Sequence, residues 1–451
     1  MSQTLIRNAT IISMDESIGD LEHADLLIEN DRIKEIGQKI NAPDAKTIDG
    51  TGFIVIPGLV NVHMHTWQTA LRSVTSNWTL LEYFKNMHAG LATNFKPSDI
   101  FIANYMGGLN QINCGTTTLG DWCHNNPTPD HTDAGIDGLE KSGVRSVFFH
   151  GSPKPDPKPG QKHFSEIPHP RSEIERLLNT KFKNKDSLVS LGMAILGPHY
   201  STYDVAVHDF KLARELGLIA SMHCAGAAAK TPDGWDRLAE DGLLGSNNNI
   251  VHGNNLTDDQ LKMMIDLGVT FSITPEGEMT QGHGYPITGR LLRLGSAPSL
   301  GVDLESGFSG DMFTVARLAL GMQRAIDNAE SRELKNSLPE TSTIYCRQVL
   351  EWITIQGAKA LKLDHEIGSL SVGKKADIVM IRADELNMWP IHDPVSSVIM
   401  QTSLLNIDTV IINGEIKKQS GKLIHDGIAE GKALLHESGM RLMKELRAST
   451  H

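Results

Sequence analysis

The sequence predicts an α/β protein, a (β/α)8 TIM barrel with a small β-sandwich domain built from both termini. Three observations lead to this fold: strand-like runs alternate with helix-like runs through the middle of the chain, polar side chains follow those strands, and short strands recur near both ends. Eight strands, each followed by a helix, make such a barrel. We expect residues 1–57 and 365–451 to form the β-sandwich, with a C-terminal helix in the second part, and residues 58–364 to form the barrel.

The composition is that of an ordinary globular protein. The 451 residues are 40% hydrophobic, which is enough for one large core or two domains. Lys and Arg total 42 against 54 Asp and Glu, and the net charge of −12 disfavours nucleic acid or a membrane as a partner. The four cysteines form no Cys-x-x-Cys pair, and no charged start precedes a long apolar run. We therefore expect a soluble, cytoplasmic protein.

Both ends of the chain are predicted to form short strands. Residues 4–56 alternate apolar runs with turn residues, and a similar pattern returns at 378–381, 398–400 and 409–412. Neither half is large enough to fold alone, so we expect the two ends to meet in one split β-domain. The alternative is two unrelated terminal subdomains.

The middle of the chain carries the strands of the predicted barrel. Helix-like stretches at 204–216, 258–267 and 313–328 have apolar residues at spacings of three and four. A doubly wound open sheet would show the same alternation, and the position of polar residues after the strands favours the barrel. Besides the strand before His63, the predicted strands are 115–119, 145–149, 189–195, 218–222, 249–251, 269–273 and 298–302.

A His-x-His pair ends the first of these strands. The chain has 19 histidines but only one such pair, His63 and His65, after an apolar run and a Pro-Gly turn. Residues two apart on a strand point to the same face, and neutral imidazole is a common zinc ligand. The pair therefore indicates half of a metal site, although a coincidental pair of histidines is the simpler alternative.

Side chains capable of chemistry follow the other predicted strands. The strand ends of a parallel barrel ring one mouth, where catalytic residues collect. Taken alone, His223 would be a core histidine and Asp303 a helix cap, but a polar residue after every strand is hard to explain by packing. The residues are Asp121, His124, His150, His199, His223, His252, Glu276, Glu278 and Asp303.

These motifs resemble the amidohydrolase superfamily, and within it the group that contains cytosine deaminase, adenosyl-homocysteine deaminases and triazine hydrolases. The resemblance covers nearly the whole chain and includes the segments 57–65, 115–118, 197–201, 251–253 and 301–303. The segment 368–377 resembles the β-sandwich return of these enzymes, which supports joining the two ends.

The resemblance implies one divalent metal ion, zinc or iron, held by His63, His65, His223 and Asp303. His252 would face the activated water as a catalytic residue beside Asp303. The expected activity is metal-dependent hydrolysis of a carbon–nitrogen bond, with an aminohydrolase of a planar nitrogen heterocycle as the first choice. The alternatives are removal of chloride or an alkylamine, hydrolysis of a cyclic amide, or a barrel that binds metal without catalysis. Relatives often form dimers, so a homodimer is expected.

One position departs from this group. Its deaminases usually carry a glutamate three residues after the fifth-strand histidine, where it protonates the ring, and here that position is Gly226. We hypothesise that Glu276 or Glu278, in the loop after the seventh strand, acts instead as a proton shuttle or substrate anchor. A solvated acidic loop is the alternative.

Four residues are predicted to contact the substrate. The loop after the first strand holds substrate in this group, and there Trp67 would stack on a planar ring or form the pocket wall, while Gln68 would contact the substrate. His199 follows the fourth strand and takes the place of the lysine that bridges two metals in other members. Glu305 would bind a cationic substrate group or cap the next helix.

Overall fold

The computed structural model describes residues 2–184 and 186–449, which form two compact units. Of the described residues, the first unit comprises 2–61, 110–118 and 311–425, and the second comprises 62–109, 119–184, 186–310 and 426–449. The domain boundaries predicted from the sequence stay predictions, because this division follows different limits.

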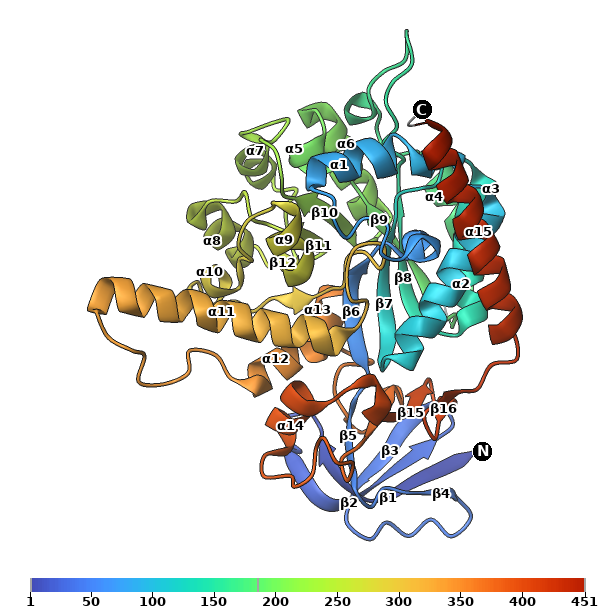
Figure 1. The fold of residues 1–451 in the computed structure, drawn as a ribbon, viewed down its shortest axis with the longest axis vertical. Helices are drawn as coiled ribbons and strands as arrows, with labels where there is room; N and C mark the ends of the chain where they lie inside the picture. Colours follow the sequence, from blue (N-terminus) through green and yellow to red (C-terminus); the bar gives the residue numbers. More distant parts are fainter. Residues whose placement is uncertain (1, 185, 450–451) are drawn as a thin grey trace. The chain divides into compact units, whose positions relative to one another are not determined.

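Eight parallel strands form the barrel, in the order β13-β12-β11-β10-β9-β8-β7-β6 (Figure 1). The two ends of this order are joined at Met64 and Asp303, where a parallel bridge forms. The His65 N–H donates to the Asp303 carbonyl at 2.7 Å, and the Asp303 N–H donates to the His63 carbonyl at 2.9 Å. The predicted α/β barrel is confirmed. Its strands are β6 (Leu59–Met64), β7 (Thr116–Cys123), β8 (Arg145–Gly151), β9 (Val189–Ala194), β10 (Ala220–Cys224), β11 (Asn248–His252), β12 (Thr270–Ile273) and β13 (Ser299–Leu300).

Helices follow the strands, as the apolar spacing predicted. Thr257 begins α8 (Asp258–Asp266) with a capping box to Gln260, which satisfies otherwise unpaired N–H groups. The C-terminal helix α15 (Ile428–Ser449) lies beside α2 (Pro97–Asn113) in Figure 1, and the Ser438 hydroxyl donates to Asp99 at 2.7 Å. The other helices of this unit are α1 (Leu80–Tyr83), α3 (Pro129–Ser142), α4 (Arg171–Asn179), α5 (Gly197–Tyr200), α6 (Tyr203–Glu215), α7 (Gly234–Glu240), α9 (Pro275–Gln281) and α10 (Thr288–Arg293).

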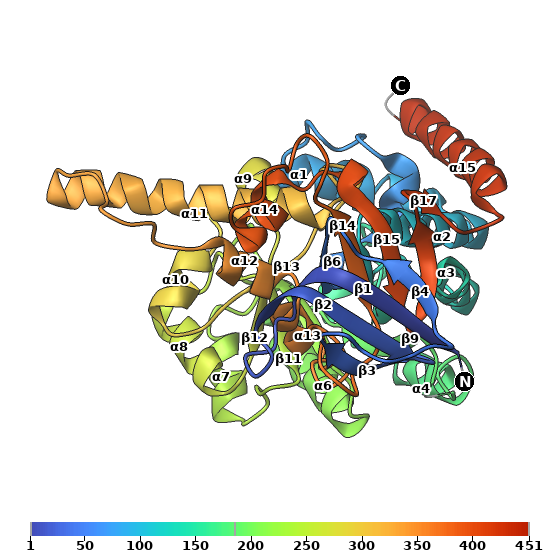
Figure 2. The same cartoon turned by 90° about the horizontal axis from the view of Figure 1, so that it is seen from below.

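The strands of both chain ends share a separate nine-stranded sheet (Figure 2). Its order is β17-β16-β15-β14-β5-β1-β2-β3, with β4 paired to β1. The junction is the antiparallel pair of β5 and β14, where Val55 faces Met380, and both side chains are fully buried. The prediction that the two ends meet is confirmed. The strands are β1 (Gln3–Ile12), β2 (Asp20–Glu29), β3 (Arg32–Gly37), β4 (Lys46–Asp49), β5 (Phe53–Pro57), β14 (Ile378–Arg382), β15 (Ile407–Ile412), β16 (Glu415–Gln419) and β17 (Lys422–Leu423).

Two elements differ in length from the sequence-based expectation. The eighth barrel strand covers only residues 299–300, because the backbone turns at Asp303 with a φ of 70°. The helix predicted at 313–328 extends over α11 (Met312–Lys335), and the Asp311 side chain caps its start. The remaining helices of the first unit are α12 (Cys346–Trp352), α13 (Ile355–Ala360) and α14 (Pro394–Gln401). The strand predicted at 398–400 is therefore wrong, because this segment is part of α14, which begins at Pro394 with the Asp393 side chain as its cap. In the described part of the chain, no helix is both long and apolar enough to span a membrane.

Candidate active site

The four predicted metal ligands lie together at the strand ends. His63 Nε2 is 3.2 Å from His223 Nε2 and 3.4 Å from Asp303 Oδ1, and His65 Nε2 is 3.5 Å from the same oxygen. All four side chains are buried. Their nitrogen and oxygen atoms therefore face one common point.

The protonation of the imidazoles decides whether this point suits a cation. Burial lowers the pKa of His65 to about 3 and holds the pKa values of His63 and His223 below their ordinary range, so the rings are neutral. The Nδ1–H of His65 donates to the Trp122 carbonyl at 2.6 Å, which leaves a lone pair on its Nε2. That lone pair faces the Asp303 carboxylate, which is itself an acceptor.

The spacing of these atoms fits a divalent ion. Ligand atoms at about 2.0–2.1 Å from a tetrahedral ion lie about 3.3–3.4 Å from one another. The separations of 3.2 to 3.5 Å in this cluster match that geometry. Nδ1 of His63 and of His223 has no hydrogen-bond partner within the described residues, so neither ring is held by a second polar contact. The donor set therefore suits a metal better than it suits a packed core.

The backbone bends at two of the site residues. His252 ends β11 with a φ of 69°, and Asp303 follows β13 with a φ of 70°. Left-handed backbone is uncommon for residues other than glycine, and outliers of this kind cluster at functional sites. The bend allows the side chains of both residues to face His63, and together the three form a second group of candidate ligand atoms.

A buried carboxylate supports His252 from behind. Glu278 is 0% exposed, and its Oε1 lies 3.2 Å from His252 Nδ1 and accepts the Thr274 N–H at 2.8 Å. The Thr274 hydroxyl lies 3.1 Å from the same His252 nitrogen and donates to Asp303 Oδ2 at 3.5 Å. Because Nδ1 is occupied, Nε2 is the nitrogen that His252 presents to the site.

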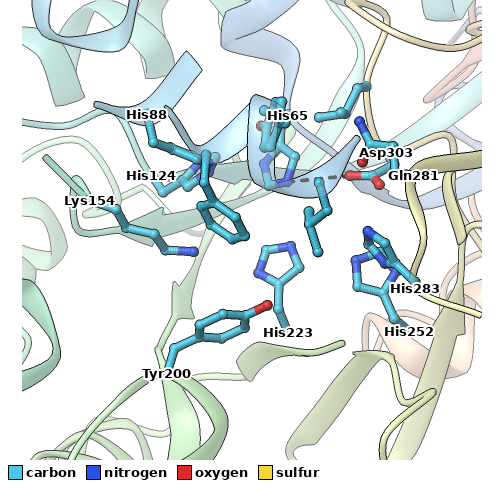
Figure 3. Close-up of a pocket in the computed structure, with 14 residues that line it drawn as sticks. His65, His88, His124, Lys154, Tyr200, His223, His252, Gln281, His283 and Asp303 are labelled. Atoms are coloured by element: carbon cyan, nitrogen blue, oxygen red, sulfur yellow. Dashed lines mark hydrogen bonds and ion pairs between the residues drawn. The ribbon is translucent and has the colours of Figure 1, made fainter. Parts of the chain in front are cut away.

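The pocket opens beside this cluster. Figure 3 shows His223 near its centre, with His252, His283 and Asp303 on one side and Lys154, His88 and His124 on the other. Leu80, the first residue of α1, and Phe84, which follows that helix, also line it. The remaining lining residues are His65, Tyr83, Tyr200, Gln281 and Leu304.

Comparison with known proteins identifies the family. The sequence model of the Amidohydrolase family matches residues 54–417. This chain belongs to the Amidohydrolase family. The predicted class of activity is thereby confirmed: this amidohydrolase is a hydrolase that acts on carbon–nitrogen bonds with a divalent metal, and its named relatives are deaminases.

Two curated relatives illustrate this. A 5-methylthioadenosine/S-adenosylhomocysteine deaminase of Thermoanaerobacter pseudethanolicus is 25% identical over 91% of this chain and 93% of its own. A 5'-deoxyadenosine deaminase of Methanosphaera stadtmanae is 25% identical over 94% and 96%.

Solved structures agree on the fold. An atrazine chlorohydrolase from Arthrobacter aurescens complexed with zinc has a TM-score of 0.82 at 22% identity, over 96% of this chain and 100% of the other. An adenosine deaminase from Xanthomonas campestris with bound zinc has a TM-score of 0.83 at 21% identity, over 98% and 99%.

The residues predicted to contact substrate in this amidohydrolase lie around the pocket without lining it. Trp67 is fully buried, and its Nε1–H donates to Nδ1 of the lining residue His124 at 3.2 Å. Gln68 donates to the Tyr83 hydroxyl at 2.6 Å. Trp67 and Gln68 therefore hold pocket residues in position.

His199 and Glu305 have other neighbours. His199 is buried, with its Nδ1 3.8 Å from the Cys224 sulfur. Glu305 is buried and forms an ion pair with Arg72 at 2.7 Å. Their predicted substrate contacts stay predictions.

The two candidate proton shuttles differ in environment. Glu278 lies against His252, as described above. Glu276, two residues earlier in α9, is partly exposed, and its Oε2 accepts the Ser309 N–H at 3.1 Å and the Ser309 hydroxyl at 2.7 Å. Of the two, Glu278 alone contacts a residue that lines the pocket.

Packing explains the glycine at position 226. Its φ is 89°, and a Cβ there would lie 2.6 Å from Leu80 Cδ2 and 3.8 Å from the Tyr200 hydroxyl. A side chain at this position would strain the backbone and push against Leu80, which lines the pocket. The departure at Gly226 therefore goes together with the left-handed backbone there and with the packing of Leu80.

Several lining residues were absent from the sequence-based prediction of the site. Lys154 lies in a proline-rich loop after β8, and a sequence of this kind predicts a solvated loop. His88 lies in a short segment that no strand precedes. Tyr200 is next to His199 in a motif that the prediction did assign to the site. Of the three, only Tyr200 had a signal that was usable from sequence alone.

Proposed function

We propose that this amidohydrolase is a zinc-dependent aminohydrolase that releases ammonia from a planar nitrogen heterocycle. The observation that carries the proposal is the convergence of three neutral imidazoles and one carboxylate beside a pocket lined by aromatic and histidine side chains. Three nitrogen ligands and a carboxylate suit zinc, although iron would also be accepted. The zinc bound by two structural neighbours supports the same choice.

His63, His65, His223 and Asp303 would hold the ion. When bound, a divalent ion of this kind acidifies water to a pKa of about 7, which makes a nucleophile available at neutral pH. The second oxygen of Asp303, hydrogen-bonded to Thr274, is free of the imidazoles and would accept the proton that the water releases.

Through its Nε2, His252 would stabilise the charge that develops on the oxygen that attacks the ring carbon. Glu278 would fix the orientation of the His252 ring and balance the charge of that ring while it carries a transferred proton, because Glu278 Oε1 contacts His252 Nδ1. Glu278 is thus a positioning residue, and the proton that relatives pass through a glutamate would pass through His252. Attack at a ring carbon that bears an amino group then breaks the carbon–nitrogen bond and yields ammonia.

A second candidate keeps the site and changes the leaving group. Gly226 supplies no acid to protonate a ring nitrogen, and chloride leaves as an anion without a proton, whereas ammonia and alkylamines need one. The missing acid therefore favours a chlorinated heterocycle over an alkylamino one within this second candidate.

The test combines metal analysis with product analysis. Purified protein is assayed for zinc and iron, and then for ammonia release from purines, pterins, pyrimidines and triazines. We expect about one zinc per chain and ammonia from at least one ring. Chloride or alkylamine release without ammonia would favour the second candidate, and a metal-free, inactive protein would contradict both. The predicted dimer and cytoplasmic location are checked by sedimentation and fractionation.

A further inference from the structure

The pocket contains one buried charge that the proposed reaction does not use. Lys154 follows β8, lines the pocket and is only 7% exposed. Its amino group points into the pocket, on the side away from His252 and Asp303 (Figure 3). A lysine is seldom buried to this extent unless a partner is present.

Within residues 2–184 and 186–449, no hydrogen bond or ion pair satisfies this ammonium. Its Nζ lies 5.0 Å from the centre of the Tyr200 ring and 5.5 Å from that of Trp122. Ring faces attract a cation, but they do not replace the three acceptors that an ammonium binds in water. The side chain is therefore held in place with its hydrogen-bonding capacity unused.

The carboxylates around the pocket are engaged elsewhere. Asp303 faces the imidazoles of the proposed metal site, and Glu278 is hydrogen-bonded to His252. Glu305 is ion-paired with Arg72. Burial holds the pKa values of His88, His124 and His223 well below their ordinary range, so these three lining rings are neutral, and the carboxylates above leave the lysine without a counter-charge.

The aromatic side chains beside the ammonium are fixed. The Tyr200 hydroxyl donates to the Ala225 carbonyl at 2.6 Å, and the Trp122 Nε1–H donates to Ser221 at 3.2 Å. A rigid wall of this kind accommodates a ligand with little reorganisation. Lys154 follows β8, the third strand of the barrel, and Glu278 follows β12, the seventh, so the lysine lies across the barrel from Glu278.

We infer that Lys154 binds an anionic substituent of the substrate, so that the heterocycle carries a carboxylate or a comparable negative group. The identity of the ring rests on the proposed function, whereas the charge of the ligand rests on the pocket. A ligand carboxylate supplies both the opposite charge and the acceptors that the ammonium needs, in a charge-assisted hydrogen bond. It would also point away from the Glu278 carboxylate. Burial lowers the pKa of Lys154 to about 8, which still leaves the amine charged at pH 7.

Matched ligands test the inference on the metal-loaded, full-length protein. Calorimetric titrations compare nicotinate with nicotinamide and 6-carboxypterin with pterin, because each pair differs mainly in one charge. The variants are Lys154→Met, which keeps the volume without the charge, and Lys154→Arg, which keeps the charge. We expect at least one acid to bind about tenfold or more tightly than its neutral partner. Lys154→Met should abolish this preference, and Lys154→Arg should retain part of it.

Three results would overturn the inference. The first is a wild-type protein that prefers neither acid. The second is a Lys154→Met variant that keeps the preference, because other groups then hold the carboxylate. The third is binding of acetate and inorganic phosphate as tight as that of the ring acids. The last result would assign the lysine to a free anion.

Thermal unfolding without ligand gives an independent readout. Because an unpaired buried charge is unfavourable, metal-loaded Lys154→Met should melt at or above the wild-type temperature. A clearly lower melting temperature would reveal a structural partner and contradict the inference. Ammonia release separates the two proposals. An acid preference without any turnover would refute the proposed function alone, and turnover of the ring acids that Lys154→Met leaves unchanged would refute the anion site alone.

Discussion

Replacing Glu278 by glutamine removes one charge from a fully buried position while the shape of the side chain is kept. Its Oε1 accepts the Thr274 N–H at 2.8 Å and contacts His252 Nδ1 at 3.2 Å, and its Oε2 has no hydrogen-bond partner within the described residues. A glutamine can place its carbonyl oxygen at the position of Oε1 and its amide nitrogen at the position of Oε2. The orientation of His252 should therefore survive, and only the charge is lost.

The size of the effect follows from this contact. A hydrogen bond to a charged group contributes about 1.5–3 kcal/mol, and one between neutral groups about 0.5–1.5 kcal/mol. If the full difference acts on the transition state, the barrier rises by about 1–2 kcal/mol, which lowers kcat roughly 5- to 30-fold. The bound metal should stay at the wild-type level, since Glu278 is outside the ligand group.

Glu276→Gln is the matched control, because it makes the same chemical change in the same helix. The Glu276 carboxylate contacts Ser309 and is partly exposed. We expect kcat within about twofold of the wild type. The assay measures kcat and KM on the substrate found in the ammonia screen, with zinc content measured on the same preparations.

Several outcomes would refute this reasoning. Wild-type kcat in Glu278→Gln would mean that the Glu278 carboxylate does not act through His252. Loss of zinc in that variant would mean that Glu278 supports the ligands and not His252. A greater loss of activity in Glu276→Gln than in Glu278→Gln would reverse the assignment.

Three further predictions concern other parts of the site. His63→Ala should lose metal and activity together, whereas His252→Asn should keep metal and slow turnover about a hundredfold or more, as metal analysis and kcat will show. Gly226→Ala should lower the melting temperature, because its Cβ would lie 2.6 Å from Leu80. An unchanged melting temperature would mean that the segment around Leu80 moves freely. Glu305→Gln should lower the free energy of unfolding in urea by about 1 kcal/mol or less with metal content unchanged, because Arg72 is 42% exposed and water replaces the lost ion pair; loss of the metal would mean that Glu305 supports the ligand group.

The barrel and the polar residues at its strand ends were predictable because their signals are local, and the family resemblance then selected the four proposed ligands among them. An apolar run followed by His63 and His65, and single polar residues after the later strands, can be read without knowing any long-range contact. The topology of a parallel barrel then brings these strand ends to one mouth. The fold of the split terminal sheet followed from the same alternation of strands and turns.

The rest of the site depends on contacts that the sequence does not display. Lys154 lies among prolines and other lysines in a segment typical of solvated loops, and only packing buries it. Trp67 has a planar ring that could stack on a substrate, but its indole is buried and donates to His124, a residue that lines the pocket. The Glu305 carboxylate could bind a cationic substrate group, but the sequence does not show that it forms an ion pair with Arg72.

The left-handed backbone at His252 and Asp303 has a consequence for how the stability of this protein can be raised by mutation. Both residues occupy a conformation that glycine adopts without penalty and that costs other residues on the order of 1 kcal/mol. Selection for heat resistance alone would thus reward glycine at the two places where reactivity resides. Libraries screened only for stability should accumulate inactive sequences there first, and any programme of stabilisation should exclude both positions from its search.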